Sequence, residues 1–381
     1  MSIFTLIAIA MGIHSCYIGS KVVVSLYALH MGASQFTVGL LAACYALVPL
    51  CLGVYTGRLA DSRGKRFPIL FGAIITIAAM LTGFVWRSLP GLFVTATLVG
   101  TGFVFFNVAV QTLGGAVGKP EHRARNFAWL AIGYSSSNLI GPVFSGFSID
   151  YFGHALTFLF LALFPLIPIV IVLRSQELPR PGKSAAAAGK RTFDLLKDAE
   201  LRKLIIISGL SVASGELFAF YVPVFSHEIG HSASTIGLIL GAYALAIVLT
   251  RFMLGTITKR FTMEQIMVSF LLFAAVAFAV FPLLRSAPAL MTIAFFIGIG
   301  VGVTQPLLMA ISYERAPPGR TGEMTGLRLT ANNLARISMP VISGVLGAAL
   351  GAAPVFWLNA LNLALMSFLS REKRASKTAP P

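Results

Sequence analysis

Long apolar runs alternate with short polar connections along almost the whole chain. Each run has at least 17 residues, and a helix needs roughly 17–25 residues to cross the hydrocarbon core of a bilayer. The runs predict twelve transmembrane helices, at residues 3–29, 36–56, 68–86, 91–117, 127–149, 155–173, 204–226, 235–255, 265–284, 289–312, 324–349 and 354–370. The pattern therefore predicts an all-α membrane protein.

The pattern also repeats at a constant offset of 198 residues. Residues 32–40 align without a gap on residues 230–238, and residues 142–146 align on residues 340–344. Shorter matches at the same offset begin at Tyr45, Arg87 and Gly100. Tandem repeats of six membrane helices are typical of secondary transporters.

This duplication predicts the domain organisation. We expect two pseudo-symmetric six-helix bundles at residues 1–173 and 204–370. Residues 174–203, which are rich in proline, alanine and basic side chains, are expected to form a flexible cytoplasmic linker that lies on the anionic headgroups. The alternative for its end, at residues 192–202, is a short interfacial helix. Residues 371–381 are expected to be a cytoplasmic tail.

Composition supports the membrane assignment, since 57% of the 381 residues are hydrophobic and 11% are charged. A soluble domain carries roughly 25% charged residues.

The net charge of +16 arises mainly in the loops on one side of the membrane. Of the 29 Lys and Arg residues, the loops on the other side hold only Arg87 and Arg285. This positive-inside bias places both termini in the cytoplasm and argues against nucleic acid as a partner.

The loop between the second and third predicted helices contains Gly57, Asp61, Gly64, Lys65 and Arg66 in a Gly-x-Leu-Ala-Asp context. It resembles the signature loop of the major facilitator superfamily. The resemblance implies the superfamily fold, and it implies that these five residues form a gating loop that locks and releases the inner gate during alternating access. Physically, the two glycines permit a tight turn and the basic pair can lie at the inner headgroups.

Several ionisable residues lie inside the predicted spans, where a charge costs at least about 2.5–3.5 kcal/mol unless it has a partner or a function. Glu216 lies near the centre of the seventh helix, Arg336 in the eleventh, and His14 and Lys21 in the first. Residues 14, 18 and 21 share one helix face, and the offset places Ile18 on Glu216. We therefore expect these faces to line a shared, water-accessible cavity.

The polar amides follow the same symmetry, because Asn107 aligns with Gln305 and Asn138 aligns with Arg336. The predicted substrate-cavity residues are Tyr17, Lys21, Asn107, Gln111, Asn138, Gln305, Asn332 and Arg336. The alternatives are that Lys21 extends to the outer surface, that His14 is a packing residue, that the amides only join helices, and that Glu216 and Arg336 form a purely structural ion pair. Arg251 is expected to extend to the inner surface or to support the gating loop.

The leading functional hypothesis is proton-coupled export of small amphipathic organic solutes by a monomer in the cytoplasmic (inner) membrane of a bacterium. Glu216 and His14 are the predicted proton-coupling residues. Residues 141–146 resemble the superfamily's antiporter motif, although Ala96 stands where drug-proton antiporters usually have an arginine. The alternative is uptake or exchange of organic anions, because Lys21 and Arg336 outnumber Glu216.

A non-transporting membrane enzyme or assembly factor is the alternative from a different class. The sequence offers no catalytic triad pattern and no phosphate-binding glycine loop to support it. Cys16, Cys44 and Cys51 lack metal-ligand spacing and are interpreted as small apolar residues. We therefore expect no cofactor, no metal and no enzymatic activity.

Overall fold

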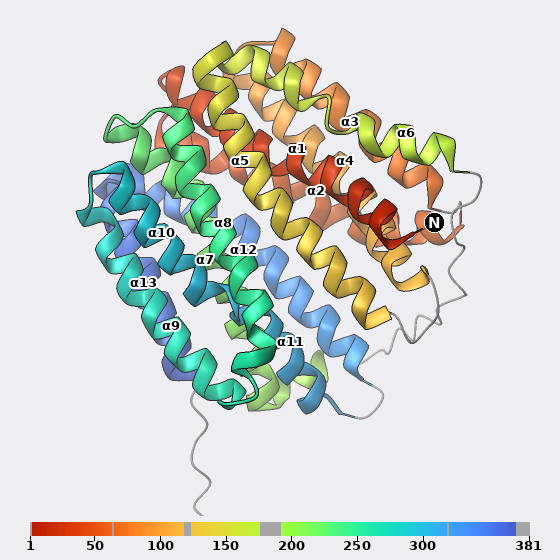
Figure 1. Cartoon of the computed structure of the whole chain (residues 1–381), viewed down its shortest axis with the longest axis vertical. Coiled ribbons are helices and arrows are strands. Elements are labelled where there is room, and N and C mark those ends of the chain that lie inside the picture. Colours follow the sequence, from red (N-terminus) through yellow and green to blue (C-terminus); the bar gives the residue numbers. More distant parts are fainter. Residues whose placement is uncertain (1, 63–64, 118–122, 176–191, 318–319, 371–381) are drawn as a thin grey trace, which may run out of the picture.

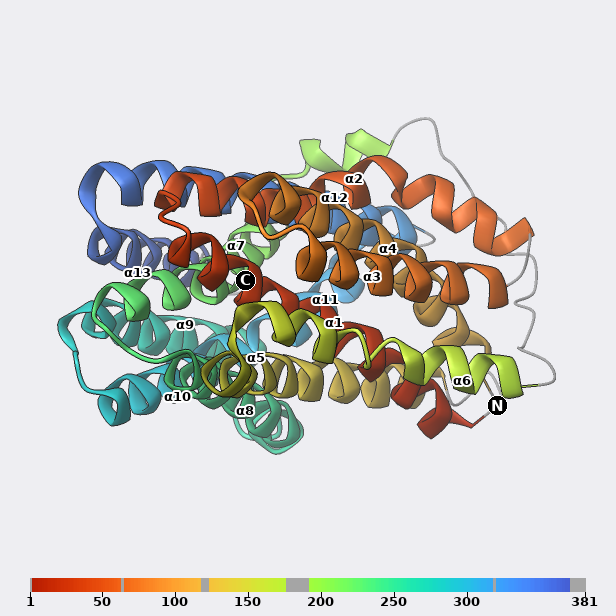
Figure 2. The ribbon, with the colours of Figure 1, turned by 90° about the horizontal axis from the view of Figure 1, so that it is seen from above.

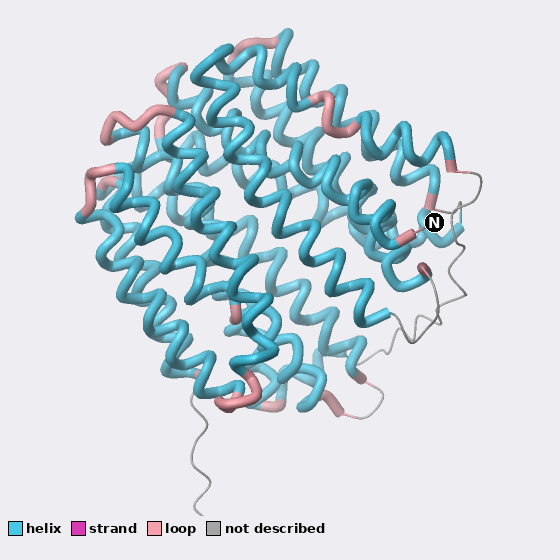
Figure 3. Tube along the Cα trace, viewed as in Figure 1, coloured by secondary structure: helices cyan, strands magenta, loops and turns pink. Residues whose placement is uncertain are grey.

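The computed structural model describes residues 2–62, 65–117, 123–175, 192–317 and 320–370. Within these residues the chain is helical apart from short turns, with no β-strand (Figure 3). The first half contains α1 (Ile3–His30), α2 (Gln35–Ser62), α3 (Arg66–Val85), α4 (Leu89–Ala116), α5 (Arg123–Leu161) and α6 (Leu166–Arg174). The second half contains η2 (Thr192–Lys197), α7 (Ala199–Glu228), α8 (Ala233–Ile257), α9 (Met263–Val280), η3 (Phe281–Leu283), α10 (Ala287–Gly302), α11 (Thr304–Arg315), α12 (Thr321–Leu350) and α13 (Ala352–Leu369).

The two halves lie side by side. In Figure 1 the red to yellow helices of the first half occupy the upper right, and most of the green to blue helices of the second half occupy the lower left. Two helix pairs join them, α5 with α8 and α2 with α12. Both pairs are visible as neighbours in Figure 2, and α1 packs against α7 between them. The first and seventh helices are therefore central, which places Lys21 and Glu216 between the halves.

The described residues contain eleven stretches long and apolar enough to span a membrane, whereas the sequence predicts twelve helices. The difference lies in Trp129–Arg174, a single stretch of 46 residues that contains both the fifth and the sixth predicted helices. Its backbone leaves the helical conformation at Gly153, where φ is 79° and ψ is 168°. A left-handed φ of this kind is easily adopted by glycine alone, so the chain changes direction inside this stretch.

The turns follow the sequence duplication. Within the described residues a positive φ occurs at Gly32, Gly153, Gly230 and Gly351. These are two pairs at the offset of 198 residues: Gly32 with Gly230, and Gly153 with Gly351. Gly351 has φ 83° and ψ 173° and separates α12 from α13. Gly153 adopts nearly the same backbone conformation at the equivalent place in the first half.

The interfaces between the halves are duplicated as well. Gly39 in α2 lies so close to α12 that a Cβ atom there would be 2.6 Å from the carbonyl oxygen of Pro340. Gly237 in α8 has the same relation to the carbonyl oxygen of Pro142 in α5, again at 2.6 Å. Small residues allow such close backbone approach between membrane helices. The aligned glycines and prolines are thus explained as paired helix crossings.

The end of the linker differs from the prediction. The helix containing Glu216 begins at Ala199 rather than near residue 204, because the Asp198 side chain accepts hydrogen bonds from the backbone N–H groups of Glu200 and Leu201. The predicted interfacial helix is a short 3₁₀ helix, η2, that ends before this cap. Most of the predicted linker and the whole predicted tail lie outside the described residues.

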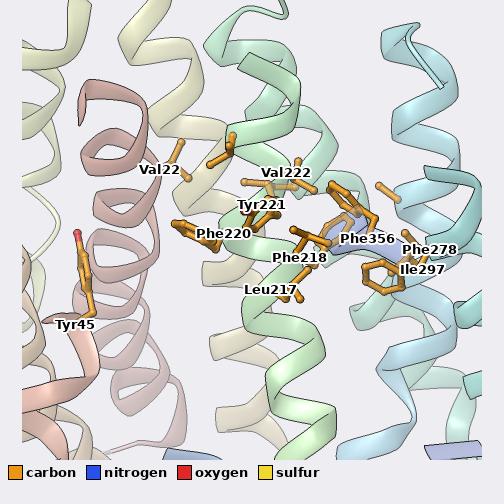
Figure 4. Packing of buried hydrophobic residues seen from close by; sticks show 14 of the residues in the cluster. Val22, Tyr45, Leu217, Phe218, Phe220, Tyr221, Val222, Phe278, Ile297 and Phe356 are labelled. Atoms are coloured by element: carbon orange, nitrogen blue, oxygen red, sulfur yellow. The ribbon is translucent and has the colours of Figure 1, made fainter. Parts of the chain in front are cut away.

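An aromatic cluster holds α7 in the second half (Figure 4). Phe218 contacts Phe278 and Phe281 edge to face, with centroid distances of 5.7 Å in both cases. Phe281 in turn stacks on Phe356 of α13 at 4.8 Å. These rings are fully buried, and such pairs contribute about 0.5–1.5 kcal/mol each beyond their buried area. The packing orients α7 so that the neighbouring residue Glu216 lies at the interface between the halves.

Candidate functional site

An ion cluster lies where α1, α7 and α12 meet. The Glu216 carboxylate is 3.0 Å from Lys21 Nζ through Oε2, and 3.4 Å from Arg336 Nε through Oε1. The Lys21 and Glu216 side chains retain about a fifth of their exposure, and Arg336 is 43% exposed. The charges are therefore paired but still reach water. Lys21 belongs to the first half and Glu216 to the second, so this ion pair connects the two halves directly.

The cluster forms part of the wall of a cavity of about 260 Å³ between the halves. The polar and charged residues that line the cavity are Lys21, Asn138, Ser211, Glu216, Tyr243, Arg251, Gln305 and Arg336. Ile18 lines it too, so both members of the symmetry-related pair Ile18 and Glu216 face the same space. Five of the predicted cavity or coupling residues are thus brought together: Lys21, Asn138, Glu216, Gln305 and Arg336.

Tyr17 contacts Lys21 but does not line the cavity. Its ring stacks on Phe103 with a centroid distance of 4.0 Å and is largely buried. Lys21 Nζ lies 4.9 Å from the centre of the same ring. A cation over the face of an aromatic ring is stabilised by the ring quadrupole. Tyr17 therefore helps to hold the ammonium group in place beside Glu216, and it does not itself line the cavity.

Two of the predicted amides form a separate cluster. Asn107 Oδ1 accepts hydrogen bonds from the Tyr134 hydroxyl at 2.9 Å and from Gln111 Nε2 at 3.2 Å. Neither amide lines the central cavity. His14 lies near them, with its ring 4.8 Å from that of Tyr134 and 5.6 Å from that of Phe103. His14 precedes Lys21 by seven positions in α1, which corresponds to about 10 Å along the helix axis. This distance separates His14 from the ion cluster.

A buried arginine that the sequence did not single out lies on α12. Arg328 is 6% exposed, and its Nη1 donates to Gln305 Oε1 at 3.3 Å. One turn further along, the side-chain amide of Asn332 lies 2.9 Å from the Ser208 hydroxyl, away from the cavity. The spacing of residues 328, 332 and 336 on one helix face could have identified Arg328.

Arg251 also differs from the expectation. It does not extend to the inner surface but lines the cavity, and its Nη1 donates to the Ser135 hydroxyl of α5 at 2.5 Å. Its Nε is buried and has no hydrogen-bond partner. Among the described residues, no carboxylate lies within ion-pair distance of this guanidinium.

Only part of the predicted gating loop can be placed. Gly57 and Asp61 fall in the last turns of α2, their side chains are not described, and Gly64 lies outside the described residues. Lys65 is buried beside the start of α3, and Arg66 Nη2 donates to the carbonyl oxygen of Leu173 at 3.4 Å. The gating role of this loop stays a prediction.

Further contacts close one end of the interface between the halves. Asp150 of α5 accepts hydrogen bonds from the backbone N–H groups of Ala233 at 3.0 Å and Ser234 at 2.7 Å, at the start of α8. Beside α12, the Tyr221 hydroxyl donates to the carbonyl oxygen of Ser343 at 2.5 Å and lies 2.9 Å from Gln35 Oε1. These contacts lie at the end that carries the turns at Gly32 and Gly230.

A comparison with known protein families identifies this helical membrane protein. The sequence model of one family, the Major Facilitator Superfamily, matches residues 3–338 and, in a second match, residues 204–381. The chain belongs to the Major Facilitator Superfamily. As a superfamily member it is a multi-pass membrane transport protein and not an enzyme.

Curated superfamily relatives match along most of the chain at low identity. Multidrug resistance protein 1 of Bacillus subtilis (strain 168) is 23% identical over 330 residues, covering 84% of this chain and 82% of the relative. Quinolone resistance protein NorA of Staphylococcus aureus (strain MRSA252) is 21% identical over 363 residues, covering 92% and 91%.

Solved superfamily structures share the fold. A nucleoside transporter, NupG, superimposes with a TM-score of 0.80 at 14% identity, covering 97% of this chain and 99% of the other. A peptide transporter, POT, superimposes with a TM-score of 0.79 at 16% identity, covering 97% and 93%. At these identities the similarity establishes the fold alone.

Proposed function

We propose that this chain exports small amphipathic organic solutes across the cytoplasmic (inner) membrane of a bacterium, driven by protons, as a monomer that alternates between two conformations. The observation that carries the proposal is the ion pair between Lys21 in the first half and Glu216 in the second. It is a titratable link between two bundles that must move relative to each other. The Arg336 guanidinium on the other side of Glu216 completes a cluster with one net positive charge.

The proposed topology has twelve membrane crossings and both termini in the cytoplasm. The 46-residue stretch would be about 69 Å long as one straight helix, roughly twice the hydrocarbon thickness of a bilayer. The left-handed backbone at Gly153 is where we place the reversal, as at Gly351 between α12 and α13. The distribution of basic residues supports the orientation. The two bundles at residues 1–173 and 204–370 are the proposed moving domains.

The proposed coupling follows from the charge of Glu216. When a proton neutralises the carboxylate, the attraction to Lys21 is lost and the two halves lose a direct link. A ligand or proton shifts a conformational equilibrium only through its different interaction with the two states. Proton binding at Glu216 meets this condition, because the ion pair exists only while α1 and α7 are close. Asp61 and its loop would act at the inner gate.

Export of drug-like solutes is the direction that the relatives support, since their names describe multidrug and quinolone resistance. Uptake or exchange of organic anions is the second candidate. The observation that favours it is the excess of Lys21, Arg251 and Arg336 over Glu216 around the cavity. An exchanger would move its substrate without a pH gradient, whereas the proposed exporter requires one.

The test is transport into proteoliposomes with the chain reconstituted and a pH gradient imposed. Three fluorescent probes share one aromatic body and differ in charge: dansylglycine (anionic), dansylamide (neutral) and dansylcadaverine (cationic). We expect pH-driven movement of at least one probe by the wild type. Glu216→Gln is expected to abolish the pH-driven part while leaving counterflow of the same probe without a gradient.

The matched control is Glu264→Gln in the first turn of α9, outside the cavity. It removes a carboxylate of the same kind and is expected to leave pH-driven transport unchanged. Unchanged pH-driven flux in Glu216→Gln would refute the coupling role. Equal flux with and without the gradient in the wild type would favour the exchanger.

A further inference from the structure

The charges around the central cavity do not balance. Glu216 is the carboxylate that lines it, and both Glu216 oxygens are engaged, one by Lys21 and one by Arg336. Arg251 lies in the wall of the same cavity without a carboxylate partner in the described parts of the chain. An unpaired guanidinium in a partly desolvated site is costly, and residues of this kind inside a membrane usually mark a substrate or ion pathway.

The guanidinium is held in place by one hydrogen bond. Its Nη1 donates to Ser135 Oγ across the interface between α8 and α5, while its Nε is buried without a partner. The Ser135 hydroxyl has no net charge, so it orients the guanidinium without neutralising it. An arginine presents its N–H donors in a planar fork that matches a carboxylate, and such charge-assisted bonds are roughly twice as strong as neutral ones.

The rest of the cavity wall suits an apolar body. Leu240, Ala244, Ile247 and Val301 line it, and the ring of Tyr243 lies among them. A volume of about 260 Å³ is close to the lower end of the range of roughly 300–1,000 Å³ for ligand pockets. The cavity therefore fits a ligand with one or two rings and a single charged group.

We propose that Arg251 binds the carboxylate of a small amphipathic monoanion, whose ring system lies against Leu240 and Val301. The inference rests on the proposed transport of amphipathic solutes and narrows their class to organic anions. Glu216 already pairs with Lys21 and Arg336 and does not neutralise Arg251. The carboxylate of the bound ligand would neutralise Arg251 instead. Lys21 and Arg336 then remain available for proton coupling through Glu216.

The test is equilibrium binding to the purified full-length chain in detergent, followed by probe fluorescence, without any gradient. We expect dansylglycine to bind more tightly than dansylamide, and dansylamide more tightly than dansylcadaverine. Arg251→Gln is expected to weaken dansylglycine binding about 10- to 100-fold, which corresponds to the roughly 1.5–3 kcal/mol of a hydrogen bond to a charged group. Its effect on dansylamide is expected to stay within about twofold.

Two further variants separate binding from a structural role. Arg251→Lys keeps the charge but loses the planar fork, so we expect an intermediate affinity for dansylglycine. Ser135→Ala removes the hydrogen bond between α8 and α5 but leaves the cation, so we expect dansylglycine binding to stay within a few-fold of the wild type. If Arg251 only joined the two helices, Ser135→Ala and Arg251→Gln would weaken binding of all three probes alike.

A competition experiment needs no variant and so does not depend on folding. On the wild type, 1-naphthoate is expected to displace dansylglycine, whereas 1-naphthylmethylammonium is not. The inference is overturned if the wild type does not bind dansylglycine, if the ammonium compound competes as well as the carboxylate, or if Arg251→Gln folds and keeps full affinity. Unchanged pH-driven flux in Glu216→Gln, with dansylglycine binding to Arg251 intact, would refute the proposed coupling alone and leave this inference standing.

Discussion

Asp150 in the first half caps the helix that begins at Ala233 in the second half. Its carboxylate accepts the Ala233 N–H at 3.0 Å, where the positive end of the α8 dipole favours a negative charge. The duplicated position is Ala348, which has no carboxylate to offer to the start of α2. Beside α12 the two halves are joined instead by the Tyr221 hydroxyl of α7, which donates to Gln35 Oε1 at the start of α2 at 2.9 Å. The same end of the protein is thus held by two chemically different contacts.

Asp150→Ala is expected to loosen this end. Loss of a helix cap costs about 0.5–2 kcal/mol, so opening of the interface should increase roughly 2- to 30-fold. The measurement is the rate of maleimide labelling of Ala233→Cys, a buried position, in a background without Cys16, Cys44 and Cys51. Asp198→Ala is the matched control because it removes the α7 cap within one half. It should lower thermal stability without changing the labelling rate, and equal rates in both variants would contradict the assignment.

The two ion pairs of Glu216 are expected to differ in strength. Lys21 lies 3.0 Å from the carboxylate and is about a fifth exposed, whereas Arg336 lies 3.4 Å away and is 43% exposed. Double-mutant cycles of Glu216→Gln with Lys21→Met and with Arg336→Met measure each coupling by unfolding in detergent. We expect roughly 1–2 kcal/mol for Lys21 and less than about 1 kcal/mol for Arg336, since water screens the more exposed pair. A larger coupling for Arg336 would show that exposure does not decide the order.

Alanine substitutions should be more destabilising at glycines in close helix crossings than at glycines with no neighbouring atoms. At Gly39 and Gly237 the added Cβ would meet a backbone carbonyl oxygen at 2.6 Å, so each change is expected to cost about 1–3 kcal/mol. At Gly255, also in α8, no atom lies within 4 Å of the added Cβ, and alanine is expected to be neutral or stabilising by up to about 1 kcal/mol. Thermal unfolding in detergent tests all three. Equal destabilisation at Gly255 would mean that helix packing is not the cause.

Gly153→Ala and Gly351→Ala test whether the two chain reversals are equivalent. Neither position has an atom within 4 Å of the added Cβ, so the cost is that of a backbone conformation essentially restricted to glycine, about 1–3 kcal/mol. We expect the two variants to lose the same stability within about 0.5 kcal/mol. A negligible effect at Gly153 alone would argue for a continuous helix there and against twelve crossings.

The fold was largely predictable because the duplicated residues are those with strict backbone requirements. Gly32, Gly39 and Pro142 recur at the constant offset, since a turn or a close helix crossing tolerates few alternatives. The boundary after the fifth predicted helix was harder, because the backbone change at Gly153 takes a single residue. The start of α7 was missed because its cap, Asp198, lies outside the apolar run.

The internal repeat and the charges inside the spans predicted part of the site, but they did not predict which side chains face the cavity. Lys21, Glu216 and Arg336 were grouped because charges within a membrane require partners, and the structure brings them together. Asn107 and Gln111 share the symmetry, but their hydrogen bonds to each other and to Tyr134 keep them away from the cavity. Arg251 was misplaced because the direction of a long side chain depends on its neighbour, here Ser135, which no periodicity reveals.

The reciprocal contacts of Gly39 with Pro340 and of Gly237 with Pro142 have the form of an isologous dimer interface, in which residue i meets residue j and j meets i. If two separate, identical protomers were joined in this way, each charged residue that lines the cavity would occur once in each protomer. A carboxylate at the Glu216 position would then face its own copy across the two-fold axis, as would an arginine at the Arg336 position. Covalent fusion of the protomers removes this constraint, because the two halves of one chain can carry different residues at equivalent positions, as Ile18 and Glu216 do.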